Sequence, residues 1–198
     1  MECDVTLMLL VIFLFVDVTD ASQERKVYTS PLRVQLEDGI FMEILEPESI
    51  RFTYKLRPAK NFGGVFNQSL AGLHLIPTDP IHGCSPLNKP YLFENQVALI
   101  ERGECSFLTK AIHAQQAGAV AAVITDNQPD NVEMYIDMIE DGTNRDSVIP
   151  VLFLLGKNGY MIRKTLQQEH LMSAIINIPV NITGIPINKL NQPPWSLW

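Results

Sequence analysis

Cysteine and clustered positive charge are both scarce in this chain of 198 residues. It holds only three cysteines, and no cluster of cysteine or histidine stands at the spacing of a zinc site, which argues against bound zinc. Lys and Arg number 15 against 22 Asp and Glu, and no basic run is longer than a pair. A nucleic-acid-binding protein would need a basic patch, so we expect no nucleic acid among the partners.

Signatures of catalysis are also missing. The sequence has no Gly-x-Ser-x-Gly elbow of a serine hydrolase and no His-Glu-x-x-His pair of a zinc peptidase. The four histidines are far apart in the sequence, and we expect His113 to be a surface or boundary residue rather than a ligand. An acidic stretch lacks the alternating spacing of a calcium loop and is interpreted as a solvated face. The stretch contains Asp130, Glu133, Asp137, Glu140, Asp141 and Asp146.

Only one long apolar run is present, and it lies near the N-terminus. Residues 5–16 are almost wholly apolar, but a bilayer span needs about 20 residues. The run therefore predicts a signal peptide at 1–21, cleaved before Ser22. Glu2 and Asp4 precede it where a signal peptide usually carries basic residues, so an uncleaved signal anchor is the alternative. We expect the mature chain to have no membrane span and to be secreted through the endoplasmic reticulum and Golgi to the extracellular space.

Removal of Cys3 with the signal peptide leaves two cysteines. In an oxidising compartment we expect Cys84 and Cys105 to pair and close a loop of about 21 residues. Such a closure stabilises a fold by about 3 kcal/mol in the chain-entropy model. Two buried free thiols are the alternative. Secretion would also allow N-glycosylation at Asn67 and Asn181, whose acceptor sequons stand beside turn residues.

The mature chain alternates strand-like and helix-like segments. Residues 50–56 alternate apolar and polar side chains, which predicts a half-buried strand paired in a hairpin with 41–46. The runs 97–100 and 119–125 are continuously apolar, as in a parallel sheet covered on both faces. Between them we expect a helix that Ser106 caps and Gly118 ends, with an apolar face formed by Phe107, Ala111, Ala114 and Ala117. Further strands are expected at 73–76, 148–155 and 174–178, a loop at 77–90 and a helix around 160–167.

The segment from Val97 to Asn127 resembles the signature of the protease-associated (PA) domain. An aliphatic strand leads into the Arg-Gly-x-Cys-x-Phe turn of Arg102 to Phe107, then into a Lys-bearing helix that ends Ala-Gly-Ala, and a second aliphatic strand closes on Asp126 and Asn127. The Ile-Pro strand entry at Ile149 also resembles this family. The similarity extends over residues 40–180. Among PA-domain proteins, the chain most resembles the small secreted ones of animals, which also carry a Phe-Gly-Gly segment and a Gln-Pro-Pro-Trp tail.

The resemblance implies a β-rich α/β fold, a single compact barrel or sandwich of about seven strands flanked by helices. The expected organisation is a signal peptide at 1–21, a lead-in at 22–39, a PA domain at 40–180 and a tail at 181–198. The resemblance also implies a non-catalytic role with no cofactor, in binding or signalling through an unidentified protein or peptide partner. An unrecognised secreted hydrolase or metal-dependent enzyme is the alternative.

By the same resemblance, the candidate binding residues are Arg102, Gly103, Asp126 and Asn127. They lie in the loops that, together with the loop around Cys84, are expected to contact a partner. Arg102 is placed where it could clamp a carboxylate or a peptide carbonyl. A structural explanation is the alternative. In it, Arg102 pairs with Glu101 or Asp126, Gly103 supplies a positive φ angle, and Asp126 and Asn127 cap the end of a strand.

The C-terminal tail carries two tryptophans behind a rigid proline pair. Trp195 and Trp198 would expose an unusual apolar area if both were left in water. We therefore expect them either to pack back onto the domain or to form a docking site for a partner.

Overall fold

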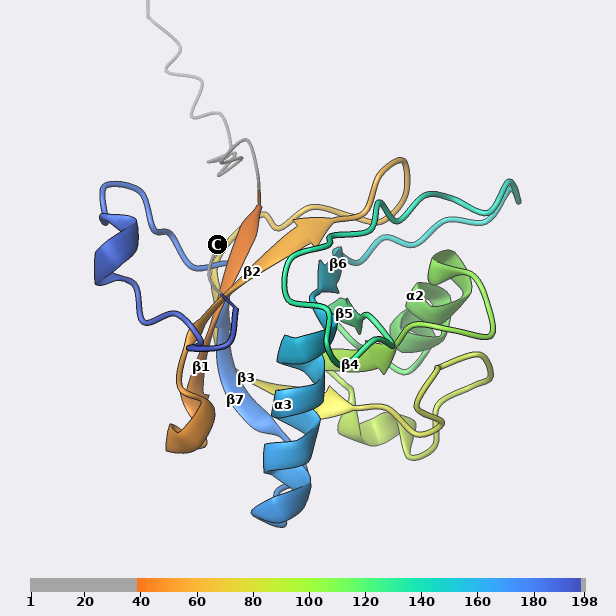
Figure 1. Cartoon of the computed structure of the whole chain (residues 1–198). Helices are drawn as coiled ribbons and strands as arrows, with labels where there is room; N and C mark the ends of the chain where they lie inside the picture. The colour runs from red at the N-terminus through yellow and green to blue at the C-terminus, as the bar shows by residue number, and fades with distance from the viewer. Residues whose placement is uncertain (1–38, 197–198) are drawn as a thin grey trace, which may run out of the picture. The chain divides into compact units, whose positions relative to one another are not determined.

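The computed structural model describes residues 39–196 (Figure 1). The expected signal peptide, nearly all of the lead-in and Trp198 lie outside the described residues. Within them, seven strands close into one barrel in the order β1-β2-β6-β5-β4-β3-β7, which confirms the expected β-rich α/β fold as a barrel rather than a sandwich. The strands are β1 (Ile40–Glu46), β2 (Thr53–Pro58), β3 (Leu70–Pro77), β4 (Val97–Glu101), β5 (Ala121–Thr125), β6 (Val151–Leu154) and β7 (Ala174–Ile178).

One half of the barrel is parallel. Strands β3, β4, β5 and β6 run side by side in the same direction, and the register sets Leu99 opposite Val123 and Val123 opposite Leu152. These three side chains fill the barrel interior, whereas their neighbours Ala122 and Ile124 belong to a second apolar cluster outside the barrel. All residues of β5 and β6 are buried, because both faces of these strands are covered. This explains their continuous apolar runs.

The helix α2 (Phe107–Gln116) covers the outer face of this half (Figure 1). Ser106 caps it as expected, since its Oγ accepts a hydrogen bond from the Thr109 backbone N–H at 3.1 Å. The buried face differs from the expected one at three positions. Phe107 is only half-buried, whereas Leu108 and Lys110 are fully buried.

The helix α3 (Gly156–Gln168) begins earlier than the sequence predicted, because its glycines allow a close approach to the barrel. A Cβ atom at Gly159 would lie 2.5 Å from Cβ of Thr125 on β5, and one at Gly156 would lie 1.9 Å from the carbonyl oxygen of Gln128. Glycine usually disfavours a helix, but here no larger residue would fit. The preceding strand is shorter than expected, because Val148 is 77% exposed and lies before β6.

The other half of the barrel is antiparallel. Strand β1 pairs with β2 and β7, and β2 pairs with β6, so the expected hairpin is confirmed. Its second strand starts at Thr53 rather than Ile50, because a short 3-10 helix η1 (Glu48–Ile50) forms the turn. Ile50 is buried there, and its carbonyl oxygen accepts a hydrogen bond from the Tyr54 hydroxyl at 3.0 Å.

Two further 3-10 helices lie in segments expected to be irregular. They are η2 (Pro90–Leu92), where the predicted loop ends, and η3 (Ile187–Lys189) in the tail. After η3 the chain returns to β2, and Trp195 packs edge-on against Phe52 with ring centroids 5.5 Å apart. Of the two interpretations of the tail, packing back onto the domain is confirmed for Trp195.

Candidate functional site

The candidate binding residues meet where two parallel strands end. The register pairs Glu101 of β4 with Thr125 of β5, so Arg102 and Asp126 follow these strands side by side. Nη1 of Arg102 donates a hydrogen bond to Oδ1 of Asp126 at 2.9 Å, and the Arg102 backbone N–H donates to the carbonyl oxygen of Thr125 at 2.8 Å. Of the two carboxylates considered as partners for Arg102, Asp126 is the one that pairs with it.

Asp126 faces inward and fixes the segment that follows β5. Its side chain is 1% exposed, against 35% for that of Arg102. Its Oδ1 also accepts from the Asn127 backbone N–H at 2.9 Å, and its Oδ2 accepts from Nδ2 of Asn131 at 2.7 Å. The carboxylate is therefore a positioning group. Arg102 and the exposed Asn127 are the members of the set that reach the surface.

Gly103 makes the turn between Arg102 and the disulfide. Its φ angle of 125° is the positive value that the structural interpretation required. A Cβ atom at this position would lie 3.4 Å from the ring of His82 and 3.8 Å from Nδ2 of Asn127. The turn thus brings the loop before Cys84 next to the end of β5.

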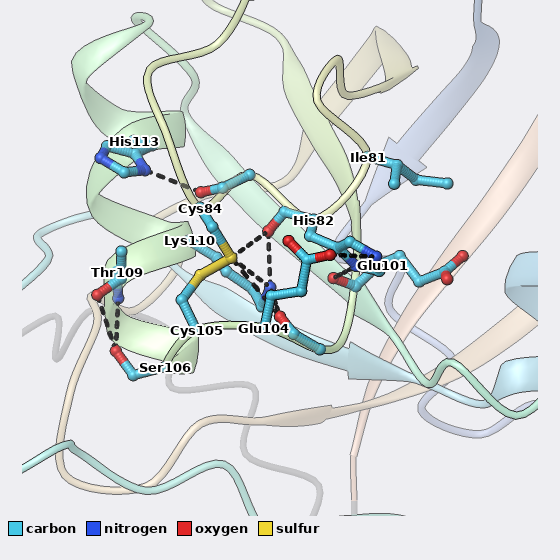
Figure 2. Close-up of a disulfide and its surroundings, with 12 residues drawn as sticks. Ile81, His82, Cys84, Glu101, Glu104, Cys105, Ser106, Thr109, Lys110 and His113 are labelled. Atoms are coloured by element: carbon cyan, nitrogen blue, oxygen red, sulfur yellow. Dashed lines mark hydrogen bonds and ion pairs between the residues drawn. A yellow bond between two sulfur atoms is a disulfide. The ribbon is translucent and has the colours of Figure 1, made fainter.

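The disulfide between Cys84 and Cys105 joins this turn to the loop after β3, with Cα atoms 5.7 Å apart (Figure 2). Nζ of Lys110 points at the disulfide from α2 and lies 3.5 Å from Sγ of Cys84. It donates to the carbonyl oxygens of His82 at 2.6 Å and Gly103 at 2.5 Å. The Lys110 ammonium group therefore joins, by hydrogen bonds, the same two loops that the disulfide links covalently.

The environment of Lys110 is unusual for a lysine. Burial lowers the pKa of its ammonium group to about 8, and the Glu104 and Glu101 carboxylates act in the opposite direction. One turn further along α2, Nδ1 of His113 donates to the carbonyl oxygen of Gly83 at 2.8 Å. His113 is thus a boundary residue with a backbone partner, as expected. The position of Lys110 between Phe107 and Ala114 at helical spacing was the sequence signal for its buried place.

A hollow of about 210 Å³ lies beside the Arg102 turn. An ion pair forms part of its wall, with Nη2 of Arg163 2.5 Å from Oε2 of Glu101 and 3.1 Å from Oγ1 of Thr125. The lining residues come from the end of β4, from the segment after β5 and from the first turns of α3. The lining consists of Glu101, Asp126, Asn127, Pro129, Gly156, Tyr160 and Arg163.

Sequence reasoning missed Tyr160 and Arg163 as members of this region. Burial lowers the pKa of the Arg163 guanidinium, while Glu101 opposes the shift. Its Nη1 is buried and has no hydrogen-bond partner among the described atoms. The signal that could have found both residues is their place on the helix after β6, since the carboxyl ends of parallel strands share one edge.

The acidic stretch between β5 and β6 is only partly a solvated face. Asp137 binds Nζ of Lys60 at 2.7 Å and Nη1 of Arg57 at 3.1 Å, and hydrogen bonding from Lys60 lowers the pKa of Asp137. Hydrogen bonds from Ser106 and Thr143 lower the pKa of Asp141. These contacts attach the acidic stretch to β2 and to the start of α2. The interpretation of the whole stretch as a solvated face is therefore wrong for Asp137 and Asp141.

Within residues 39–196, no group of three or more His, Cys, Asp or Glu side chains could hold a metal ion. None of the helices described there is long and apolar enough to cross a membrane. The sequon residues Asn67 and Asn181 are both exposed, and Oδ1 of Asn181 accepts a hydrogen bond from the Thr183 backbone N–H at 2.9 Å.

Comparison with known proteins identifies the family to which this chain belongs. The sequence pattern of the PA domain matches residues 71–162. The PRADC1-like protein of Drosophila melanogaster is 50% identical over 161 residues, which cover 80% of this chain and 82% of that protein. The chain belongs to the PA-domain family. The Arg102 turn, the disulfide, α2 and the Asp126–Asn127 end of β5 all lie within the matched part of this PA domain.

Other relatives carry a similar segment within longer chains. Human ER degradation-enhancing alpha-mannosidase-like protein 3 is 32% identical over 103 residues, which are 50% of this chain and 11% of that protein. The receptor homology region, transmembrane domain- and RING domain-containing protein 1 of Arabidopsis thaliana is 33% identical over 142 residues, covering 69% and 42%. The zinc aminopeptidase BSAP of Bacillus subtilis has a TM-score of 0.48 at 20% identity, over 72% of this chain and 30% of that one. The matched segment is thus a minor part of the human and Arabidopsis thaliana relatives.

Proposed function

We propose that this PA domain is a secreted, non-catalytic glycoprotein that binds a protein or peptide at the surface formed by Arg102, Gly103 and Asn127. The observation that carries the proposal is the rigidity of this surface. The disulfide, the Lys110 ammonium group and the Asp126 carboxylate all hold the same turn from different sides. A surface fixed before binding loses little conformational entropy when a partner arrives.

The exposed groups suit a peptide backbone. Arg102 uses Nη1 on Asp126, and a guanidinium group carries further N–H donors that can reach a carbonyl or carboxylate oxygen. The Asn127 amide can both donate to and accept from a peptide unit. The hollow next to Asn127 offers space for one side chain of the partner.

Secretion and glycosylation form part of the same proposal. The apolar run at 5–16 supports a cleaved signal peptide, and the disulfide is typical of an oxidising compartment. Expression in animal cells should yield protein in the medium that begins near Ser22 and loses mass on glycosidase treatment. The Asn67→Gln and Asn181→Gln variants should each remove part of that loss. Retention in membranes with an intact N-terminus would contradict the proposal.

Binding is tested by affinity capture from conditioned medium. Asn127→Ala removes the exposed amide but keeps the backbone N–H that donates to Asp126, so the turn should stay intact. Partners captured by the wild type should be lost from Asn127→Ala and kept by Asn144→Ala, which removes an exposed amide from the segment before β6. Equal capture by all three proteins, with unchanged melting temperatures, would exclude this surface.

The non-catalytic part of the proposal has its own test. The purified secreted protein should show no hydrolytic turnover over an activity panel, with or without added zinc or chelator. Turnover that the chelator abolishes would favour a metal-dependent enzyme instead.

A further inference from the structure

The C-terminal tail is connected to the barrel by an exposed segment. The chain leaves β7 through Val180, whose backbone N–H donates to the carbonyl oxygen of Phe41 at 2.8 Å. Most residues from 181 to 189 are exposed, and the segment makes local hydrogen bonds, such as that from the Lys189 backbone N–H to the carbonyl oxygen of Pro186 at 2.8 Å. The segment therefore links β7 to the end of the tail but packs little against the barrel.

The residues that follow position 189 contact the domain through hydrogen bonds of Asn191 to the backbone. Asn191 accepts a hydrogen bond at its carbonyl oxygen from the Thr53 backbone N–H at 2.7 Å. Its Nδ2 donates to the carbonyl oxygen of Arg51 at 2.5 Å. The tail therefore contacts the backbone at the start of β2 through one backbone acceptor and one side-chain donor of Asn191.

An aromatic anchor completes the contact. The Trp195 ring packs edge-on against Phe52, and its Nε1 donates to Oδ1 of Asn158 on α3 at 3.0 Å. Oγ of the buried Ser196 donates to the carbonyl oxygen of Val132 at 3.3 Å. Arg51, Phe52, Asn158 and Val132 lie far from the tail in the sequence, and they form its seat.

The seat is built to accept an indole. Asn158 is fully buried, and its Oδ1 finds its donor in Trp195. Without the indole N–H this buried oxygen would lose its partner, which is unfavourable in an apolar setting. Phe52 directly precedes β2 and Asn158 lies on α3, two elements that the barrel core holds through Tyr54 and Ile162. Phe52 and Asn158 are therefore placed by contacts other than those with the tail.

We propose that this seat is a peptide-binding groove for a Pro-Pro-Trp-Ser segment, occupied in cis by residues 191–196 and able to bind the same segment supplied by a second copy of this chain. Linkage in one chain gives the tail a high effective concentration, so the cis form dominates. The nine residues from 181 to 189 span up to about 30 Å when extended, which lets a released tail reach a neighbouring copy.

The experiment cuts the folded protein in the exposed segment. A site-specific protease sequence is inserted after Gly184, where a side chain would meet no atom within 4 Å. After cleavage, native mass spectrometry follows the tail fragment, and a fluorescent synthetic peptide of residues 187–198 is added. We expect the fragment to stay bound and to exchange with the peptide, with the barrel still folded by circular dichroism.

Two matched peptides test the anchor. Trp195→Ala should weaken binding at least about tenfold, because it removes both the ring contact and the indole N–H. Ile187→Ala should bind like the parent, because Ile187 is 59% exposed. A cut barrel that unfolds, that loses the fragment without rebinding the peptide, or that binds both variants equally would overturn the proposal.

Discussion

The two halves of the barrel are fastened in different ways. The parallel half, β3 to β6, is held by its crossover helix α2, a disulfide and the partly buried Arg102–Asp126 ion pair. The antiparallel half closes through the pairing of β1 with β2 and β7, and the tail packs noncovalently at the start of β2, anchored by Trp195. The two halves should therefore respond to different changes, the parallel half to loss of the disulfide and the antiparallel half to loss of Trp195.

Removing the disulfide should have the largest effect. Replacing Cys84 and Cys105 together by serine should lower the free energy of unfolding by about 3 kcal/mol, because the unfolded chain gains the freedom of the open loop. Urea denaturation measures the change, and secretion should fall with it. Ser85→Ala, in the same exposed loop, is the control. An unchanged unfolding midpoint would show that the parallel half does not depend on its covalent tie.

Removing the tail anchor should have the next largest effect. Trp195→Ala should lower the free energy of unfolding by about 2 kcal/mol, through lost ring packing and an unpaired Asn158 oxygen. Hydrogen exchange should rise at the start of β2 and α3 but not at β4 and β5. Uniform loss of protection over both halves would erase the proposed contrast between them.

Lys110 should give the parallel half a distinctive alkaline response. Its pKa is about 8 in the folded protein against 10.5 for an ordinary lysine, so the unfolded chain binds more protons between these values. The free energy of unfolding should therefore rise as pH increases through this window, while the neutral amine still donates to both carbonyls. The Glu104 and Glu101 carboxylates already moderate the pKa shift that burial causes.

The comparison variants for this response are Lys110→Met and Lys189→Met. The first should lose the alkaline rise, and the second, in the exposed tail segment, should keep it. Thermal unfolding between pH 7.5 and about 10 measures both. If the rise persists in Lys110→Met, another group causes it.

The smallest effect is expected at Asp141. Hydrogen bonds from Ser106 and Thr143 lower its pKa, so its contribution is present above the unfolded carboxyl pKa and is lost as pH falls through the folded value. Asp141→Asn should lower the melting temperature slightly at pH 7 and flatten the acid-side dependence. Glu140→Gln, on an exposed neighbour, should do neither. If Glu140→Gln changed the melting temperature as much as Asp141→Asn, the hydrogen-bonded Asp141 and the exposed Glu140 would not differ in their contribution to stability.

Sequence reasoning predicted the parallel half well. Runs such as 119–125 are apolar on both faces, and the residues from Arg102 to Phe107 belong to a specific motif. It also predicted the cap at Ser106 and the disulfide, because both depend on local pattern or on cysteine number.

What it missed depends on contacts distant in the chain. The start of α3 at Gly156 is set by how closely the helix approaches Gln128 and Thr125. Lys110 has its two carbonyl partners, His82 and Gly103, on two loops that are distant in sequence and joined by the disulfide. The choice between packing and docking for Trp195 was open because its partner Asn158 has no sequence signature.

The most direct test of the binding surface is photo-crosslinking from position 128, which leaves Asn127 in place. A photoreactive phenylalanine replaces the exposed Gln128, next to Asn127, in the protein expressed in animal cells, and another protein carries it at the exposed Asn188 of the tail. We expect a discrete crosslinked partner from position 128 that excess unlabelled wild-type protein competes away, and none from position 188. Crosslinks from both positions alike, or only from 188, would contradict the claim that the Arg102 turn is the surface with which this PA domain binds.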